Sequence, residues 1–238
     1  MEINEQTNNQ INSDEALLLS QRVDVNSAIP LTSQILRIAV YDEFKAYEAY
    51  SKIIEKFGLV QPFVNIKEAE AVHYGALIRL MEKYQVEVPI NNWYDKIEVP
   101  NTLIECCEMG VAGEISNIAM YNNLLLHAFE DDIKDVLFRL QAASFNNHLP
   151  TFRNCVLTHY NSTDSTNIGS INQENIMEKL GEYQVLIDDI MSGNIDENSI
   201  SKIFSKLNLT MASGAVFGGA IIALLNNYMP KTNQKEEE

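Results

Sequence analysis

The sequence is poor in helix-breaking residues and in basic residues. Only 6 of its 238 residues are proline and 10 are glycine, whereas 46% are apolar, which is typical of a globular protein and not of a disordered one. Lysine and arginine number 17 against 33 acidic residues, giving a net charge of −16. Such a chain repels phosphate backbones, and it has no basic stripe with interleaved aromatics, so we expect no nucleic-acid partner. Cations remain compatible with this charge.

Cysteine is also scarce. Cys106, Cys107 and Cys155 form no CxxC pair and are odd in number, which argues against a disulfide framework and favours a reducing compartment. The first ten residues, MEINEQTNNQ, lack the basic start and the apolar run of a secretory signal peptide. We therefore expect a cytoplasmic protein, with membrane association as the alternative.

Helical periodicity dominates the middle of the chain. Residues 1–30 are polar and predict a flexible N-terminal arm. Across residues 31–160, apolar residues recur at steps of three and four and predict four helices, which cover about 32–57, 65–84, 101–128 and 131–160. The last two helices are joined by a short turn and the second and third by about 16 residues, so we expect an all-α four-helix bundle with one long crossover.

Each predicted helix carries a charged or metal-binding residue on its apolar stripe. These residues are Glu43 on the first helix, Glu70 and His73 on the second, Glu114 on the third and His148 on the fourth. Ionised carboxylates buried at one level would repel one another and would need a partner. A multivalent cation provides the opposite charge and accepts oxygen and imidazole ligands together. The sequence therefore predicts a metal site, and a buried polar network without metal is the alternative.

Four segments carry a family resemblance: DEFKAYEAY, EAEAVHYGAL, MGVAGEISNIAMY and LQAASFNNHLPTF. Together they resemble the rubrerythrin-like branch of the ferritin-like superfamily, over about residues 32–160. In that superfamily two helices each contribute a Glu and two contribute a Glu-x-x-His motif, and together they hold a pair of irons. The resemblance thus implies a ferritin-like bundle in which the five residues bind one or two iron ions, with manganese or zinc as alternatives.

The fourth helix departs from the family pattern. Phe145 stands where the second Glu-x-x-His motif would have its Glu, which leaves three carboxylates and two imidazoles. A single ion or an asymmetric pair is therefore an alternative to a complete di-iron centre. Candidate hydrogen-bond partners around the ligands are Tyr47, Tyr121, Ser144 and Asn147.

The C-terminal third is predicted separately. Residues 161–171 are a linker by composition, residues 172–230 predict a helical extension with an apolar helix over 209–228, and residues 231–238 form a solvated tail. The apolar helix has three interpretations: packing on the bundle, anchoring in a membrane, or self-association through small residues.

The five candidate ligands and the family resemblance favour a metal-binding protein with an iron-dependent oxidoreductase, iron-handling or oxidative-stress function. Dioxygen or peroxide would be the reactant, and an enzyme of this kind would be a non-haem iron oxidoreductase of the ferroxidase or peroxide-reducing type. We also expect a homo-oligomer. The alternative is a non-catalytic helical scaffold that keeps its polar core for packing specificity and docks to a partner or a membrane through the C-terminal apolar helix.

Overall fold

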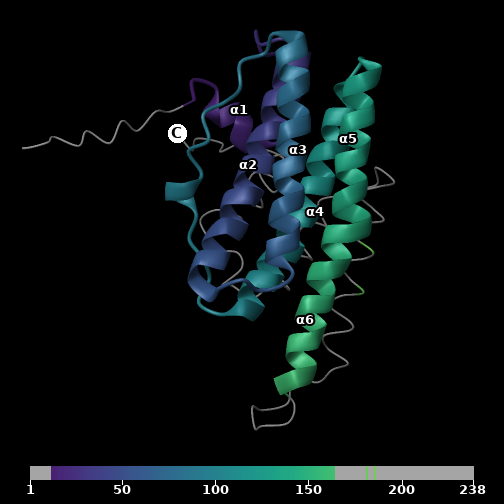
Figure 1. Ribbon diagram of the computed structural model, residues 1–238. Helices are drawn as coiled ribbons and strands as arrows, with labels where there is room; N and C mark the ends of the chain where they lie inside the picture. Colours follow the sequence, from purple (N-terminus) through teal and green to yellow (C-terminus); the bar gives the residue numbers. More distant parts are fainter. Residues whose placement is uncertain (1–11, 164–180, 182–184, 186–238) are drawn as a thin grey trace, which may run out of the picture.

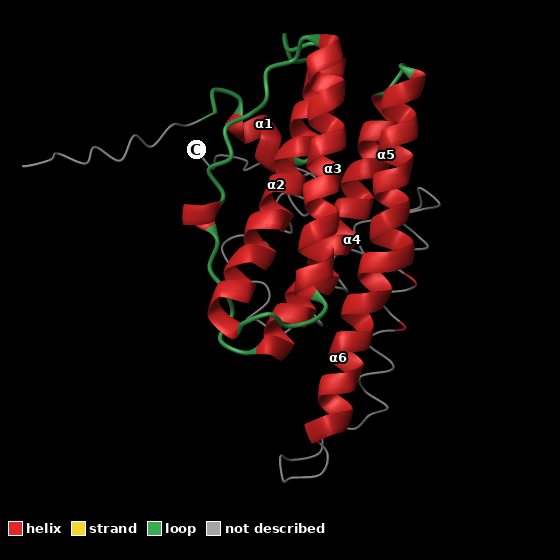
Figure 2. Ribbon diagram, viewed as in Figure 1, coloured by secondary structure: helices red, strands yellow, loops and turns green. Residues whose placement is uncertain are grey.

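The computed structural model describes residues 12–163 and the isolated positions 181 and 185, and the first of these stretches folds into helices joined by loops (Figures 1 and 2). No strand occurs within these residues, so the prediction of an all-α fold is confirmed for this part of the chain. The elements in chain order are α1 (Glu15–Ser20), α2 (Leu31–Phe57), α3 (Phe63–Tyr84), η1 (Tyr94–Lys96), α4 (Leu103–His127), α5 (Asp131–Ala143), η2 (Ser144–His148) and α6 (Leu149–Thr163).

Local sequence signals set the helix boundaries. α2 begins directly after Pro30 and ends at Gly58, whose φ of 86° is a conformation that residues with a side chain rarely adopt. α4 begins with a capping box, in which the Thr102 hydroxyl accepts from the Glu105 backbone and the Glu105 carboxylate accepts from the Thr102 backbone. Because these signals lie in the sequence itself, the first three predicted helices match α2, α3 and α4 closely.

The long helices lie side by side (Figure 1). α2 and α3 share the most extensive contact, α4 packs against α2, α5 and α6, and α3 also contacts α5. α4 and α5 are joined by a short turn and are neighbours, as predicted. The inner faces of these helices therefore surround one common interior.

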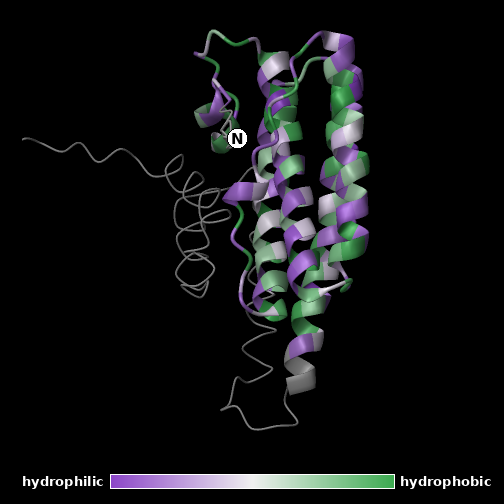
Figure 3. Ribbon diagram, turned by 60° about the vertical axis from the view of Figure 1, so that its left-hand side comes forward, coloured by the Kyte–Doolittle hydropathy of each residue, from purple (hydrophilic) through white to green (hydrophobic). Residues whose placement is uncertain are grey.

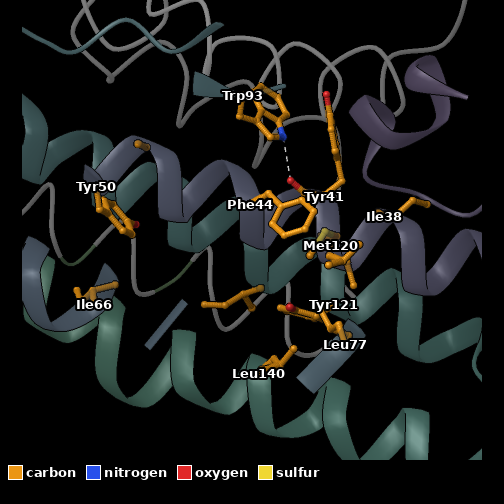
Figure 4. Packing of buried hydrophobic residues seen from close by; sticks show 14 of the residues in the cluster. Ile38, Tyr41, Phe44, Tyr50, Ile66, Leu77, Trp93, Met120, Tyr121 and Leu140 are labelled. Atoms are coloured by element: carbon orange, nitrogen blue, oxygen red, sulfur yellow. Dashed lines mark hydrogen bonds between the residues drawn. The ribbon is translucent and has the colours of Figure 1, made fainter. Parts of the chain in front are cut away.

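A long connection runs the length of α2 and links α3 to α4 (Figure 1). Trp93 fastens it, because its side chain is buried and its indole N–H donates to the Tyr41 carbonyl at 2.9 Å (Figure 4). Lys52 of α2 donates to the Tyr94 and Ile97 carbonyls at 2.9 and 2.7 Å. The connection thus covers one side of α2.

The N-terminal segment is more ordered than expected. The sequence predicts a flexible arm over residues 1–30, but residues 12–30 lie against the long helices and contain α1, whose Leu18 is buried. The Arg37 guanidinium of α2 donates to both carboxylate oxygens of Asp14, at 2.7 and 2.6 Å. The prediction is therefore wrong for residues 12–30, because a short apolar run and a two-bond ion pair hold this polar segment in place.

The predicted fourth helix consists of three parts. α5 gives way to the π-helical segment η2, which is followed by α6. Pro150 lies at the second position of α6 and has no N–H to donate, and the local break in α-helical bonding lies immediately before it. π-Helical turns occur frequently at functional sites. The two buried residues of this turn are Ser144 and His148, both predicted as site residues.

Apolar side chains from every long helix fill the interior. Phe44 of α2, Leu77 of α3, Tyr121 of α4 and Leu140 of α5 are all buried and converge there (Figure 4). Hydrophobic and hydrophilic residues alternate along each helix (Figure 3), as expected for helices with one buried and one exposed face. Burial of this apolar surface is the main source of the stability that holds the polar site in place.

A disulfide corrects the expectation drawn from cysteine scarcity. Cys107 of α4 and Cys155 of α6 are bonded, with Cα atoms 6.0 Å apart, and Cys106 stays a buried free thiol. Two of the three cysteines pair across a helix interface while the third is left over, so an odd number of cysteines did not exclude a disulfide.

The predictions for the C-terminal third lie largely outside the described residues. α6 continues through residue 163 and so enters the expected linker, 161–171. Apart from positions 181 and 185, the extension 172–230 with its apolar helix 209–228 and the tail 231–238 are outside the description. Among the described helices, none is both long and apolar enough to cross a membrane.

Candidate metal site

The structure brings the five predicted ligands together in the interior. Glu43 comes from α2, Glu70 and His73 from α3, Glu114 from α4 and His148 from η2. The three glutamates and His148 are at most 5% exposed. The His73 side chain is 13% exposed. Four separate helical elements therefore contribute to one cluster, as the positions of these residues on the predicted apolar stripes imply.

The first half of the cluster joins α2 to α3. His73 Nδ1 lies 3.2 Å from Glu43 Oε2 and 2.9 Å from Glu70 Oε2. The three ligand atoms all lie within 4.8 Å of one another. We refer to Glu43, Glu70 and His73 as the first half-site.

The second half joins α3 to α4 and η2. His148 Nδ1 lies 3.3 Å from Glu70 Oε1 and 3.6 Å from Glu114 Oε1, and these ligand atoms too lie within 4.8 Å of one another. We refer to Glu70, Glu114 and His148 as the second half-site. Glu70 belongs to both half-sites and turns one oxygen toward each imidazole, so its carboxylate is placed to bridge them.

The spacing of these atoms fits metal coordination. Ligand atoms held about 2.1 Å from one ion lie roughly 3 to 3.5 Å from each other in tetrahedral or octahedral geometry, close to the distances between the imidazole nitrogens and the carboxylate oxygens. His148 Nδ1 is buried and has no hydrogen-bond partner among the described residues, although two carboxylate oxygens face it. A buried polar atom in this condition is costly, and a shared cation would satisfy it.

Burial and mutual charge set the protonation of the carboxyl groups. Burial raises the pKa of Glu43 to about 8, and the charge of Glu70 adds to the effect. Burial likewise raises the pKa of Glu114. Burial also opposes ionisation of Glu70, but its interactions with His148 and His73 prevail and lower its pKa. The bridging position is thus the one at which a negative charge is best stabilised.

The two imidazoles respond in the opposite sense. Burial by itself would lower the pKa of His73 and of His148, yet the neighbouring carboxylates raise both to about 10. Their rings are stacked, with centroids 5.5 Å apart. In the absence of metal, the imidazoles therefore carry the positive charge that the buried carboxylates require.

Two buried tyrosines hold the outer carboxylates in a reciprocal arrangement. Tyr121 of α4 donates its hydroxyl to Glu43 of α2, and Tyr50 of α2 donates to Glu114 of α4 at 3.2 Å. In each helix the Glu precedes the Tyr by seven residues, or two turns. Tyr121 was among the predicted partners and Tyr50 was not, although the repeated Glu-x6-Tyr spacing was a signal that could have identified it.

A buried polar chain adjoins the second half-site. The Ser144 hydroxyl donates to Asn117 Oδ1 at 2.8 Å, and Asn117 Nδ2 donates to Asp42 Oδ2 at 3.0 Å. The other Asp42 oxygen accepts from Lys45 Nζ and from Gln21 Nε2, both at 2.6 Å. Ser144, a predicted partner, is therefore positioned by Asn117. Asn117 is in turn held by the ion pair between Asp42 and Lys45, and Asp42 directly precedes Glu43 in the sequence.

Tyr47 and Asn147, two predicted hydrogen-bond partners, and Phe145, which stands in place of the family's Glu, do not take part in the site. Within the described part of the chain, neither Tyr47 nor Asn147 bonds to a site carboxylate. The Tyr47 ring packs edge-on against Tyr74 at 5.5 Å, and Asn147 is exposed and accepts through its carbonyl from Thr151. The expectation for these two residues is wrong, because sequence proximity to a ligand does not fix the direction of a side chain. Phe145 packs against the apolar core.

Comparison of the chain with protein-family profiles, with curated proteins and with solved structures finds no match.

Proposed function

We propose that the chain is a ferritin-like metal-binding protein, in which α2, α3, α4 and the α5–α6 stretch form a four-helix bundle around a pair of metal ions. The observation that carries the proposal is the placement of Glu70, whose two oxygens face two separate Glu/His groups in the buried interior. A structural ion pair needs one partner for a buried carboxylate. The need for one partner does not explain why Glu70 belongs to two complete groups of metal-binding side chains.

The donor set supports iron, with manganese or zinc as alternatives. Glu43, Glu70 and His73 would hold one ion, and Glu70, Glu114 and His148 the other. Carboxylate and imidazole ligands suit divalent iron, manganese and zinc, whereas soft copper(I) sites use sulfur ligands. Three carboxylates would also offset most of the positive charge of two divalent ions.

Iron bound in such a site supplies electrons for the reduction of dioxygen or peroxide, and the proposed activity is therefore ferroxidase or peroxide reduction. The protein's own residues keep the donors in position. Tyr121 donates to Oε1 of Glu43, which leaves Oε2, the oxygen that faces His73, available as a ligand. Tyr50 donates to Oε1 of Glu114, the same oxygen that faces His148, and so orients the ligand atom itself.

An aromatic wall separates one end of the site from water. The rings of Tyr50, Phe63 and Phe152 are fully buried, and their centroids lie 5.5 to 6.0 Å apart. Charged groups in such an environment interact more strongly than in water. The more exposed His73 side chain marks the side on which small reactants would approach.

Metal analysis tests the proposal. Full-length protein, purified without chelators and loaded with Fe(II) under anaerobic conditions, should bind about two ions per chain. Glu70→Ala should abolish binding, while Glu43→Ala and Glu114→Ala should each retain about one ion. Glu68→Ala is the matched control, because Glu68 lies on the same helix and is exposed.

Three outcomes would decide against this function. Less than roughly a tenth of an equivalent of metal after loading would overturn it, because a complete set of carboxylate and imidazole ligands should be close to fully occupied under these conditions. Unchanged stoichiometry in Glu70→Ala would show that the metal binds elsewhere. Tight binding without any acceleration of Fe(II) oxidation by peroxide or dioxygen would leave a metal-holding scaffold, the competing interpretation, in place of an oxidoreductase.

A further inference from the structure

The disulfide lies at a matched distance from two ligands of the second half-site. Cys107 precedes Glu114 by seven residues on α4, and Cys155 follows His148 by seven residues on α6. Two helical turns correspond to about 10 Å along each helix. The disulfide therefore ties α4, which carries Glu114, to α6, which continues directly from the η2 turn that carries His148, and it lies on the same side of both ligands.

Close packing fills the space between the bridge and the ligands. Phe152 of α6 presses on α4 at Gly110, where a Cβ would meet ring atoms of Phe152 at 2.5 and 2.6 Å. The Phe152 ring also packs against Tyr50, with centroids 5.5 Å apart, and Tyr50 donates to Glu114. A shift of α6 relative to α4 would thus move His148, which directly precedes α6, and would also disturb Glu114 through the contact of Phe152 with Tyr50.

The first half-site has no such link. Its ligands come from α2 and α3, which the disulfide does not join. The bridge therefore constrains one half of the cluster and leaves the other half free of its influence, apart from Glu70, which they share.

We propose that Cys107 and Cys155 form a redox-active site whose oxidation state controls the metal affinity of the second half-site. This inference rests on the proposed metal-binding function. With the bridge intact, Glu114 and His148 are held at the separation that one ion needs; after reduction, α6 is released from its covalent tie to α4 and that half-site binds more weakly. Metal binding and disulfide stability are then thermodynamically coupled, so each strengthens the other by the same factor.

The reductant is a small or protein-borne dithiol. Cys155 is half-buried and Cys107 is 1% exposed, so the attacking thiolate reaches the Cys155 sulfur. A mixed disulfide forms at Cys155 and Cys107 leaves as a thiolate, which takes up a proton. The second thiol of the reductant then displaces Cys155, so that two thiols form in the protein and one disulfide forms in the reductant.

The test compares metal affinity in the two redox states. Full-length protein is titrated with Mn(II), whose oxidation state does not change under anaerobic conditions, once as purified with the disulfide intact and once after reduction by a phosphine, which adds no thiol ligand. Reduction should weaken one of two binding events by roughly 5- to 100-fold, the usual range of coupling between sites, and leave the other within about twofold. Conversely, each tenfold of coupling should make the disulfide about 30 mV harder to reduce when Mn(II) is bound.

Variants separate the coupling from general damage. Cys107→Ser with Cys155→Ser should behave like the reduced protein in both redox conditions, whereas Cys106→Ser, which alters the neighbouring thiol, should respond like the wild type. Equal affinities in both redox states, or equal weakening of both binding events, would overturn the coupling alone. Absence of Mn(II) binding in either state, with Fe(II) binding absent as well, would overturn the proposed function and this inference together. If the double variant does not fold, the phosphine-treated wild type still gives the answer.

Discussion

Replacing Gly110 with alanine tests the packing that places α6 on α4. Glycine inside a helix costs about 0.5–1 kcal/mol relative to alanine, so an unobstructed substitution would stabilise the protein. At Gly110 the new Cβ would lie 2.5 Å from one Phe152 ring atom and 2.6 Å from two more, whereas carbon atoms pack favourably at about 3.5–4.0 Å. One of the two partners must therefore move by about 1 Å.

The ring has little room to move. Phe152 is fully buried, and the ring centroids of Tyr50 and Phe63 lie 5.5 and 5.6 Å from its own. Overpacking of a core typically costs about 1–3 kcal/mol, and we expect the upper part of this range. After subtraction of the gain in helix propensity, Gly110→Ala should destabilise the protein by about 1–2 kcal/mol. This corresponds to a fall in Tm of roughly 2–8 °C for a chain of this size.

Gly75 provides a matched control. It lies within α3, and a Cβ there would meet only the end of the Arg79 side chain, at 3.8 Å. Gly75→Ala should therefore stabilise the protein by up to about 1 kcal/mol, opposite in sign to Gly110→Ala. Phe152→Leu combined with Gly110→Ala should cost less than the sum of the two single changes, because the smaller side chain relieves the clash.

Thermal and urea unfolding of Gly110→Ala, Gly75→Ala, Phe152→Leu and the double variant measure these changes in stability. If Gly110→Ala is as stable as the wild type or more stable, the close approach of α4 and α6 is not what the geometry indicates. Metal titration adds a second measurement, because any outward displacement of α6 should weaken the second half-site before the first.

Three further changes test the polar contacts. Asp14→Asn should cost about 1 kcal/mol at neutral pH; the hydrogen bond from Arg37 lowers the pKa of Asp14 below 3.8, so this stabilisation is present above that value and is lost as the pH falls through the lower folded pKa. Lys45→Met leaves the buried Asp42 without its cation and should cost about 3–5 kcal/mol in urea unfolding, part of which Asp42→Asn should restore. Tyr121→Phe removes a hydroxyl that donates to a buried site carboxylate and should cost about 1–3 kcal/mol in metal-free protein.

Each of these has a contradicting result. A difference in Tm between Asp14→Asn and the wild type that stays constant from pH 7 to about pH 2.5 would exclude the proposed linkage with the carboxylate. A Lys45→Met variant of wild-type stability would mean that the Lys45 ammonium is not needed to keep Asp42 buried. For Tyr121→Phe, unchanged unfolding would show that the hydroxyl is not needed by its carboxylate.

The positions of the five candidate ligands followed from local periodicity. A helix repeats every 3.6 residues, so a Glu or His on an apolar stripe faces the interior wherever that helix packs. Glu43 and Glu114 were found in this way although 71 residues separate them in the sequence. The repeated Glu-x6-Tyr spacing marks Tyr50 as a candidate partner, but its hydrogen bond to Glu114 depends on how far α2 is shifted along α4, and the spacing alone does not specify that shift.

The sequence by itself determined α2, α3 and α4, most of their ends and the inward-facing polar residues, because capping signals and side-chain periodicity act within a few residues of the chain. Tertiary structure alone decided which cysteines pair, how residues 12–30 dock on α2, and that Glu70 serves two half-sites at once. These are contacts between residues far apart in sequence, and their geometry depends on the relative position of whole helices. The protein's candidate chemistry therefore resides in residues that the sequence identifies and in distances that only the packed helices set.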